Sequence, residues 1–207
     1  MTYAQTIFVA AAVLFSQAWN PALLRAGAPT DQVRQTADKV LAVLQDAGLK
    51  SPDKQKERRE QLRQVIGARF DFNEMAKRSL GLHWRRGNDD EQREFVRLFT
   101  GLLEKSYADQ MEAYNGEKII YGRENMSQEQ AEVETKVVTK KGENISINYK
   151  LRSVNSKDWK VYDVVIENVS IVNNFRSQFN RIMANASFAD LLKKLESKSP
   201  DVSAVRG

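Results

Sequence analysis

The 207-residue chain contains no cysteine and only one histidine, His83. Without cysteine, a disulfide framework, a thiolate metal site and a cysteine nucleophile are all excluded. The sequence offers no second histidine that could bind a metal together with His83. It also has no recognisable nucleophile-elbow motif whose serine His83 could activate, so we expect a structural role for His83. The sequence also has no glycine-rich phosphate loop, which indicates that this chain does not itself bind and hydrolyse ATP.

Long hydrophobic runs are equally scarce. The apolar stretch from Ile7 to Phe15 has about ten residues, whereas a helix needs about 20 to span a bilayer. No charged side chain precedes Arg25. These features predict a secretory signal over residues 1–28, with a buried N-terminal helix as the alternative. One domain over residues 29–197 and a flexible tail over 198–207 account for the rest of the chain.

The charges of the chain are spread along it. There are 32 Lys and Arg against 27 Asp and Glu, a net charge of +5, without a concentrated basic run. This distribution favours a solvated surface, with a mild preference for anionic membranes as the alternative. No helix combines a basic stripe with exposed aromatics, so we expect no nucleic-acid partner.

Helix signals dominate the first half of the sequence and return at its end. Several segments have apolar residues at helical spacing. They begin at a capping residue or a first-turn proline, and some of them end at a glycine. The predicted helices run from Thr30 to about Ala47, from Pro52 to about Ile66, from Asp71 to Gly81, from Asn88 to about Tyr114, and onward from caps at Ser170 and Ser187.

Between these helices the period changes to two and β-branched residues become frequent. The predicted strands are Lys118 to Gly122, Ala131 to Thr139, Asn144 to Ser153, and Trp159 to Glu167. Their short connections indicate antiparallel neighbours. The fold class is therefore α+β, with a sheet of four strands or slightly more wrapped by helices. In the last strand, strict alternation would put Val161 and Val165 on one side.

Candidate catalytic groups are few. Asp89, Asp90 and Glu91 lie at a helix start, where the helix dipole explains them. Asp163 and Glu167 could form an acid–base pair, assisted by Tyr107 or Tyr162, although edge charges paired with lysines are the favoured interpretation. From these patterns alone, the sequence predicts a secreted α+β domain without a visible active site.

The segment from Trp159 to Phe179, WKVYDVVIENVSIVNNFRSQF, resembles the signature of the MlaC, or toluene-tolerance, family. Upstream, Phe70-Asp71-Phe72, Trp84, Phe95 and Phe99 match the same family in order and spacing. The likeness covers about Thr30 to Leu195. It departs at Asn168 and Phe175, where the family often has Gly and Tyr.

The resemblance implies a periplasmic phospholipid carrier that is not an enzyme and has no cofactor. The sheet is expected to be bent and, with its helices, to enclose an apolar cavity for the acyl chains of the phospholipid cargo. The implied partners are an inner-membrane ABC transporter with a lipid-binding ring and an outer-membrane lipoprotein complex. A lipid-free adaptor of the transporter and a secreted enzyme are the alternatives. The residues expected to line the cavity are Phe95, Phe99, Leu102, Tyr107, Val133, Val137, Ile145, Ile147, Tyr149, Val161, Val165, Phe175 and Phe179.

Overall fold

The computed structural model describes residues 28–114, 116–155 and 157–197. The predicted signal, apart from Ala28, and the predicted C-terminal tail lie outside the described residues. Within these ranges, no helix has the length and apolar character needed to cross a membrane. The helices are α1 (Ala28–Gln45), α2 (Gln55–Arg69), α3 (Phe72–Leu80), α4 (Asp89–Glu112), α5 (Ile171–Met183) and α6 (Phe188–Glu196), with short 3₁₀ turns η1 (Ala47–Leu49), η2 (Pro52–Lys54) and η3 (Gly81–Arg86).

One antiparallel sheet follows α4, and its strands lie side by side in chain order. They are β1 (Lys118–Met126), β2 (Gln130–Val138), β3 (Asn144–Ser153), β4 (Trp159–Ile166) and the two-residue β5 (Val169–Ser170). The predicted α+β class and the four main strands are confirmed. β1 extends beyond the predicted end at Gly122, because a bulge between Tyr121 and Glu124 lets the strand continue past the glycine.

The starts of α4, α5 and α6 follow the capping residues seen in the sequence, whereas the prediction that a helix starts at Thr30 is wrong, since α1 already includes Ala28 and Pro29. Asn88 and Glu91 exchange hydrogen bonds of 3.0 Å at the start of α4. Ser170 accepts from the Asn173 backbone N–H, and Ser187 forms a capping box with Asp190. Each of these capping side chains accepts a hydrogen bond from a backbone N–H that has no partner within the helix. The local sequence therefore determines where these helices begin.

The turn between β4 and β5 contains the asparagine that departs from the family pattern. Glu167 and Asn168 both have left-handed backbone conformations, with φ of 47° and 65°. Asparagine tolerates this region better than most residues that carry a side chain, so the turn forms without glycine. The Glu167 carboxylate also accepts a hydrogen bond from the Ser146 N–H on β3.

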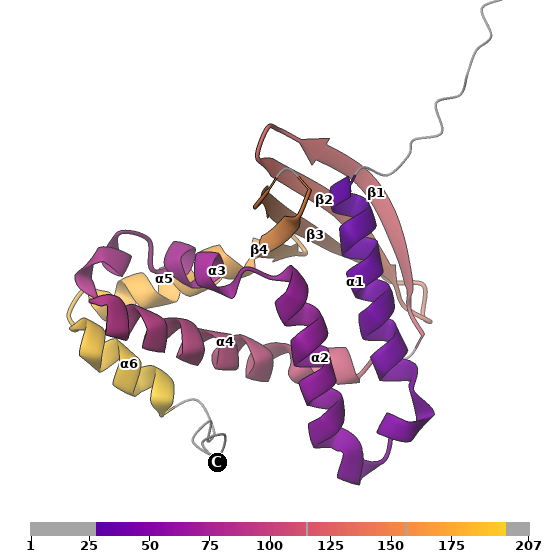
Figure 1. Ribbon diagram of the computed structural model, residues 1–207, viewed down its shortest axis with the longest axis horizontal. Coiled ribbons are helices and arrows are strands. Elements are labelled where there is room, and N and C mark those ends of the chain that lie inside the picture. Colours follow the sequence, from indigo (N-terminus) through magenta and orange to yellow (C-terminus); the bar gives the residue numbers. More distant parts are fainter. Residues whose placement is uncertain (1–27, 115, 156, 198–207) are drawn as a thin grey trace, which may run out of the picture.

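Two groups of helices divide the molecule (Figure 1). α1 lies across the sheet and contacts β1, β2 and β4, and α2 packs beside it. α3, α4, α5 and α6 gather at the other end, and α3 and α5 also contact β4. Helix α4 links the two groups, since its first half lies among the helices and its second half approaches α2. There Arg63 of α2 holds Glu104 of α4 with hydrogen bonds of 2.9 and 3.0 Å.

The helical end is built around stacked phenylalanines. The rings of Phe95 and Phe99 on α4 lie 5.8 Å apart and are fully buried. Phe175 and Phe179 of α5 meet them edge to face, at 5.3 Å from Phe99 and 5.4 Å from Phe95. Such offset and edge-to-face pairs add to the stabilisation from buried apolar area. This end of the molecule is a close-packed core.

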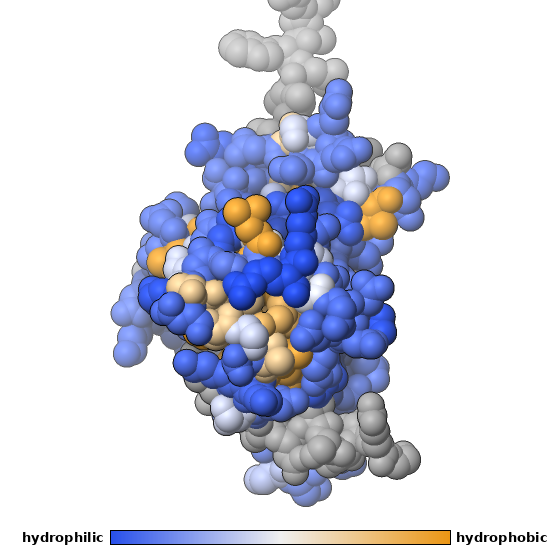
Figure 2. Space-filling view, turned by 90° about the vertical axis from the view of Figure 1, so that its left-hand side faces the viewer, coloured by the Kyte–Doolittle hydropathy of each residue, from blue (hydrophilic) through white to orange (hydrophobic). Residues whose placement is uncertain are grey.

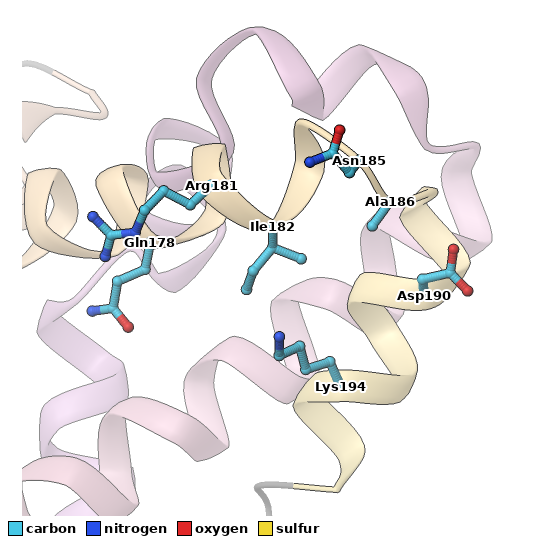
Figure 3. Close-up of a pocket in the computed structure, with 7 residues that line it drawn as sticks. All are labelled: Gln178, Arg181, Ile182, Asn185, Ala186, Asp190 and Lys194. Carbon is cyan, nitrogen blue, oxygen red and sulfur yellow. The ribbon is translucent and has the colours of Figure 1, made fainter.

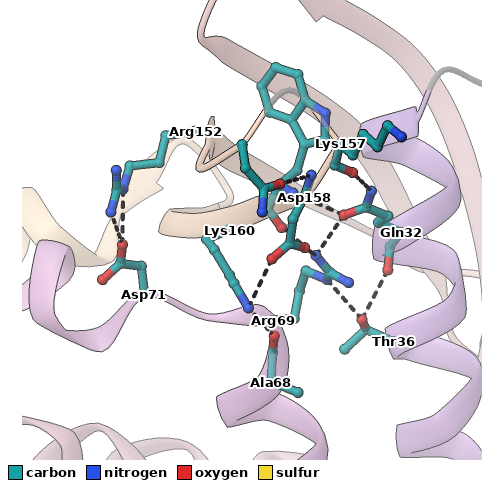
Figure 4. A network of polar contacts seen from close by, with 11 residues as sticks. Gln32, Thr36, Ala68, Arg69, Asp71, Arg152, Lys157, Asp158 and Lys160 are labelled. Atoms are coloured by element: carbon teal, nitrogen blue, oxygen red, sulfur yellow. Dashed lines mark hydrogen bonds and ion pairs between the residues drawn. The ribbon is translucent and has the colours of Figure 1, made fainter.

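A polar network joins α1 and α2 to the start of β4 (Figure 4). The Arg69 guanidinium at the end of α2 donates to Gln32 of α1 at 2.6 Å and to Asp158 at 2.9 Å. It also reaches the Trp159 carbonyl, and Gln32 accepts from the Trp159 N–H. Burial opposes ionisation of Asp158, but the hydrogen bonds from Arg69 and Lys160 outweigh it and lower the pKa of this carboxyl. The network therefore sets the position of α1 over the sheet.

Candidate functional site

The sheet face beneath α1, here called the inner face, presents rows of side chains that the strand register defines. One row contains Tyr121, Thr135, Ile147 and Ile166 from four successive strands. α1 is held against this face because the Thr30 N–H and hydroxyl both donate to Glu124 of β1, at 2.8 and 2.5 Å. Apart from the Tyr121 phenol and the Thr135 hydroxyl, which donates to the Ile147 carbonyl at 2.6 Å, this row is apolar, and α1 lies over it.

Burial changes along the inner face. At the end near the Arg69 network, Ala131, Leu151 and Val161 are all buried. At the opposite end, Val137 and Ile145 pair across β2 and β3 and are only partly buried. One end of the face is thus closed by packing, whereas the other keeps apolar surface that a ligand can contact.

Tyr149 and Ile147 lie between these two ends. Both are partly buried and pack against the hydrophobic core. Burial, with a smaller contribution from Tyr121, raises the pKa of the Tyr149 phenol to about 12. Neutral phenol is the form that this environment stabilises.

Helix α1 and the second half of α4 show the same partial burial. The apolar stripe of α1 is buried at Val33, while its later members remain partly exposed. Leu102 and Tyr107, on the second half of α4, are also partly buried and pack against the core. Burial raises the pKa of the Tyr107 phenol. The partly buried α1 residues on this stripe are Ala37, Val40, Leu41 and Leu44.

The predicted lining residues therefore separate into two groups. Phe95, Phe99, Phe175 and Phe179 belong to the stacked aromatic core, where neighbouring rings occupy their surfaces. Val133 and Val161 lie on the inner face but are fully buried. The members that retain accessible apolar surface are Leu102, Tyr107, Val137, Ile145, Ile147 and Tyr149.

Val165 does not share a face with Val161, so that prediction is wrong. The register shifts between the Lys150–Asp163 and Leu151–Val161 pairs, which adds one residue to β4. Beyond this bulge Val164 pairs with Tyr149 on the inner face, and Val165 pairs with Asn148 on the other. A bulge reverses the alternation of every later residue, and simple alternation in the sequence does not reveal it.

Sequence reasoning also missed inner-face residues on the edge strand and on β4. Ile119 pairs with Val137 and Tyr121 pairs with Thr135, so both stand on the inner face. The alternation of Ile119, Ile120 and Tyr121 was available as a signal, since Ile120 points away and is exposed. Ile166 belongs to the same face through its pairing with Ile147.

The acidic groups considered for catalysis have structural partners. Asp163 is buried and accepts from the Ser170 hydroxyl at 2.6 Å and the Val172 N–H at 3.1 Å, which anchors the start of α5. The Tyr162 ring lies beneath the Arg78 guanidinium at 4.1 Å. His83 lies on η3, 3.3 Å from an Arg86 nitrogen. Across the described ranges, no cluster of three or more His, Asp or Glu side chains is arranged to hold a metal ion.

A separate hollow of about 610 Å³ lies between α5 and α6 (Figure 3). Arg181, Asp190 and Lys194 stand around it, with Ile182 and Ala186 as its apolar members. Figure 2 shows the helical end of the molecule, where a patch of hydrophobic residues is surrounded by hydrophilic ones. The charged groups make this hollow unsuitable for acyl chains, unlike the inner face of the sheet.

Comparison with known proteins identifies the family. The model of the MlaC protein family matches residues 34–197. The chain belongs to the MlaC family. Among solved structures it is similar to a phospholipid-binding protein from Ralstonia solanacearum, determined in complex with a phospholipid, with 22% identity and a TM-score of 0.73. The match covers 82% of this chain and 95% of that one, and at this identity it shows a shared fold. No curated protein matches the chain at a significant level.

Proposed function

We propose that this MlaC-family protein is a periplasmic carrier that binds one glycerophospholipid, with its acyl chains against the inner face of the sheet. The observation that carries the proposal is the burial gradient along this face. Val137, Ile145 and Ile147 keep accessible apolar surface beside a core that is otherwise close-packed. The phospholipid in the structurally similar Ralstonia protein supports the same class of ligand.

The free energy of exposing lipid tails explains why such a carrier needs an enclosed apolar face. Each methylene moved from water into an apolar environment contributes about 0.8 kcal/mol, so about 30 methylenes contribute about 24 kcal/mol. Only near-complete burial offsets this cost. Because a membrane buries the tails equally well, net transfer between membrane and protein is nearly balanced, and lipid can move in either direction without a catalytic residue.

In this account the protein exchanges lipid with an inner-membrane ABC transporter and an outer-membrane lipoprotein complex, and any energy comes from the transporter. Family membership supports this role. Asp163 accepts hydrogen bonds from Ser170 and Val172, and the Arg78 guanidinium lies over the Tyr162 ring. Because both proposed catalytic groups already have structural partners, these contacts argue against the enzyme alternative. A lipid-free adaptor would have no use for accessible apolar residues beneath α1.

The proposal is tested by native mass spectrometry of protein purified from the periplasm without detergent, followed by transfer assays between vesicles. We expect one diacyl phospholipid per chain and measurable movement of labelled phospholipid from donor to acceptor vesicles. Protein that is lipid-free and takes up no phospholipid from vesicles would contradict the carrier role and support the adaptor alternative.

A further inference from the structure

The proposed function leaves open where the charged part of the lipid lies. We propose that Arg34 and Tyr121 form the binding site for the lipid phosphodiester, at the edge of the sheet where α1 crosses β1. This inference rests on the carrier function and adds to it a specific phosphate contact. It makes Arg34 a specificity-determining residue for lipids that carry a phosphate.

The position of Arg34 follows from the anchoring of α1. The Thr30–Glu124 hydrogen bonds fix the start of the helix on β1, and Arg34 comes one turn later. Its guanidinium carbon then lies 4.6 Å from the centroid of the Tyr121 ring. A cation over an aromatic face is attracted by the ring and keeps its orientation, while the N–H donors along the edge of the guanidinium remain available.

Arg34 is exposed, and among the residues that the structure describes no salt bridge holds its guanidinium. By contrast, Arg69 and Arg152 are held by carboxylates, Asp158 and Asp71. An oriented guanidinium without a carboxylate partner can bind a phosphate through two parallel N–H bonds.

The surroundings of Tyr121 connect this cation to the apolar face. Tyr121 pairs with Thr135, and Thr135 pairs with Ile147, so all three belong to one row of the inner face. Tyr149 is near enough for Tyr121 to contribute to its raised pKa. From the edge inward, the row therefore presents a cation, a phenol, the Thr135 hydroxyl and then an aliphatic side chain. A glycerophospholipid has the same order of phosphate, ester groups and acyl chains.

Asp38 is the negative group that opposes such a site. It lies one turn beyond Arg34 on α1, and burial, then the charge of Asp38, raise the pKa of Tyr121 while Arg34 lowers it. Asp38 is thus close enough to act on the same ring. A phosphate bound beside Arg34 would feel repulsion from this carboxylate, so the two residues are expected to have opposite effects on phospholipid binding.

The test compares a phospholipid with a diacylglycerol that has the same acyl chains, using purified, delipidated protein. Arg34→Gln should weaken phospholipid binding by about tenfold or more, since a charge-assisted hydrogen bond is lost, and leave diacylglycerol binding unchanged. Tyr121→Phe should act in the same direction with a smaller effect. Asp38→Asn should strengthen phospholipid binding. Lys39→Gln, which removes an exposed charge from the outer side of the same helix, is the matched control.

Equal weakening of both lipids by Arg34→Gln would show a structural role for Arg34, and no change in either would remove Arg34 from the site; both results overturn this inference. In both cases the carrier function stands, because the unmodified protein still binds lipid. If the unmodified protein binds neither lipid, the carrier proposal fails and this inference fails with it. Melting temperatures of all four variants, expected to match the parent, exclude misfolding as the cause.

Discussion

Replacing Ile147 by tryptophan distinguishes a ligand space from a packed core. Ile147 stands midway along β3 on the inner face, opposite Thr135 and Ile166, and is only partly buried. If the space before it holds lipid, the larger ring occupies volume that the acyl chains need. The lipid-free protein should then keep its melting temperature, while bound phospholipid falls sharply.

In a close-packed core the same substitution would cost about 1 to 3 kcal/mol through overpacking. For a domain of this size, that cost lowers the melting temperature by about 2 to 12 °C. Leu151→Trp is the control, because Leu151 is on the same strand and face but is 0% exposed. It should show the full loss of stability. Calorimetry and lipid extraction on both variants decide the question: a large destabilisation of Ile147→Trp with unchanged lipid content would refute the assignment.

Three further outcomes follow from the packing and the pKa shifts. Phe95→Ala should destabilise the protein by about 3 to 5 kcal/mol in chemical denaturation, because Phe95 is fully buried among stacked rings, and the folded fraction should still bind lipid. Arg69→Met should cost about 1.5 to 3 kcal/mol by removing charged hydrogen bonds to Gln32 and Asp158, and a variant as stable as the parent would contradict the role of that network. Burial raises the pKa of Tyr149 to about 12, against about 10 for an exposed phenol, so this group should leave the free energy of unfolding unchanged below pH about 10 and should lower it as the pH rises toward about 12. Tyrosinate absorbance of the parent and of Tyr149→Phe should show one step near pH 12 that only the parent has.

Local signals in the sequence predicted much of the fold. Asn88, Ser170 and Ser187 identified helix starts because their side chains pair with backbone groups only a few residues away. Ile145, Ile147 and Tyr149, which were predicted together as lining residues, do share one face of β3, since they alternate in sequence and no bulge interrupts the pairing with β2.

Long-range packing determined the parts that could not be predicted. Phe95 and Phe179 have the same apolar character as Ile147, and only the meeting of α4 with α5 places them in a closed core. The bulge in β4 depends on pairing with β3, so Val165 was assigned to the wrong face. The contact between Arg34 and Tyr121 joins residues far apart in the chain, and no pattern in the sequence connects them.

The central claim, that acyl chains lie against the accessible end of the inner face, can be tested by photo-crosslinking in living cells. A photoreactive phenylalanine analogue is placed at Val137 or Ile145 on the inner face, and at Ile120 on the outward side of β1 as the control. Mass spectrometry of the purified variants should show phospholipid adducts at Val137 and Ile145 and none at Ile120. Equal adducts at all three positions, or none at Val137 and Ile145 in protein that carries lipid, would contradict the account.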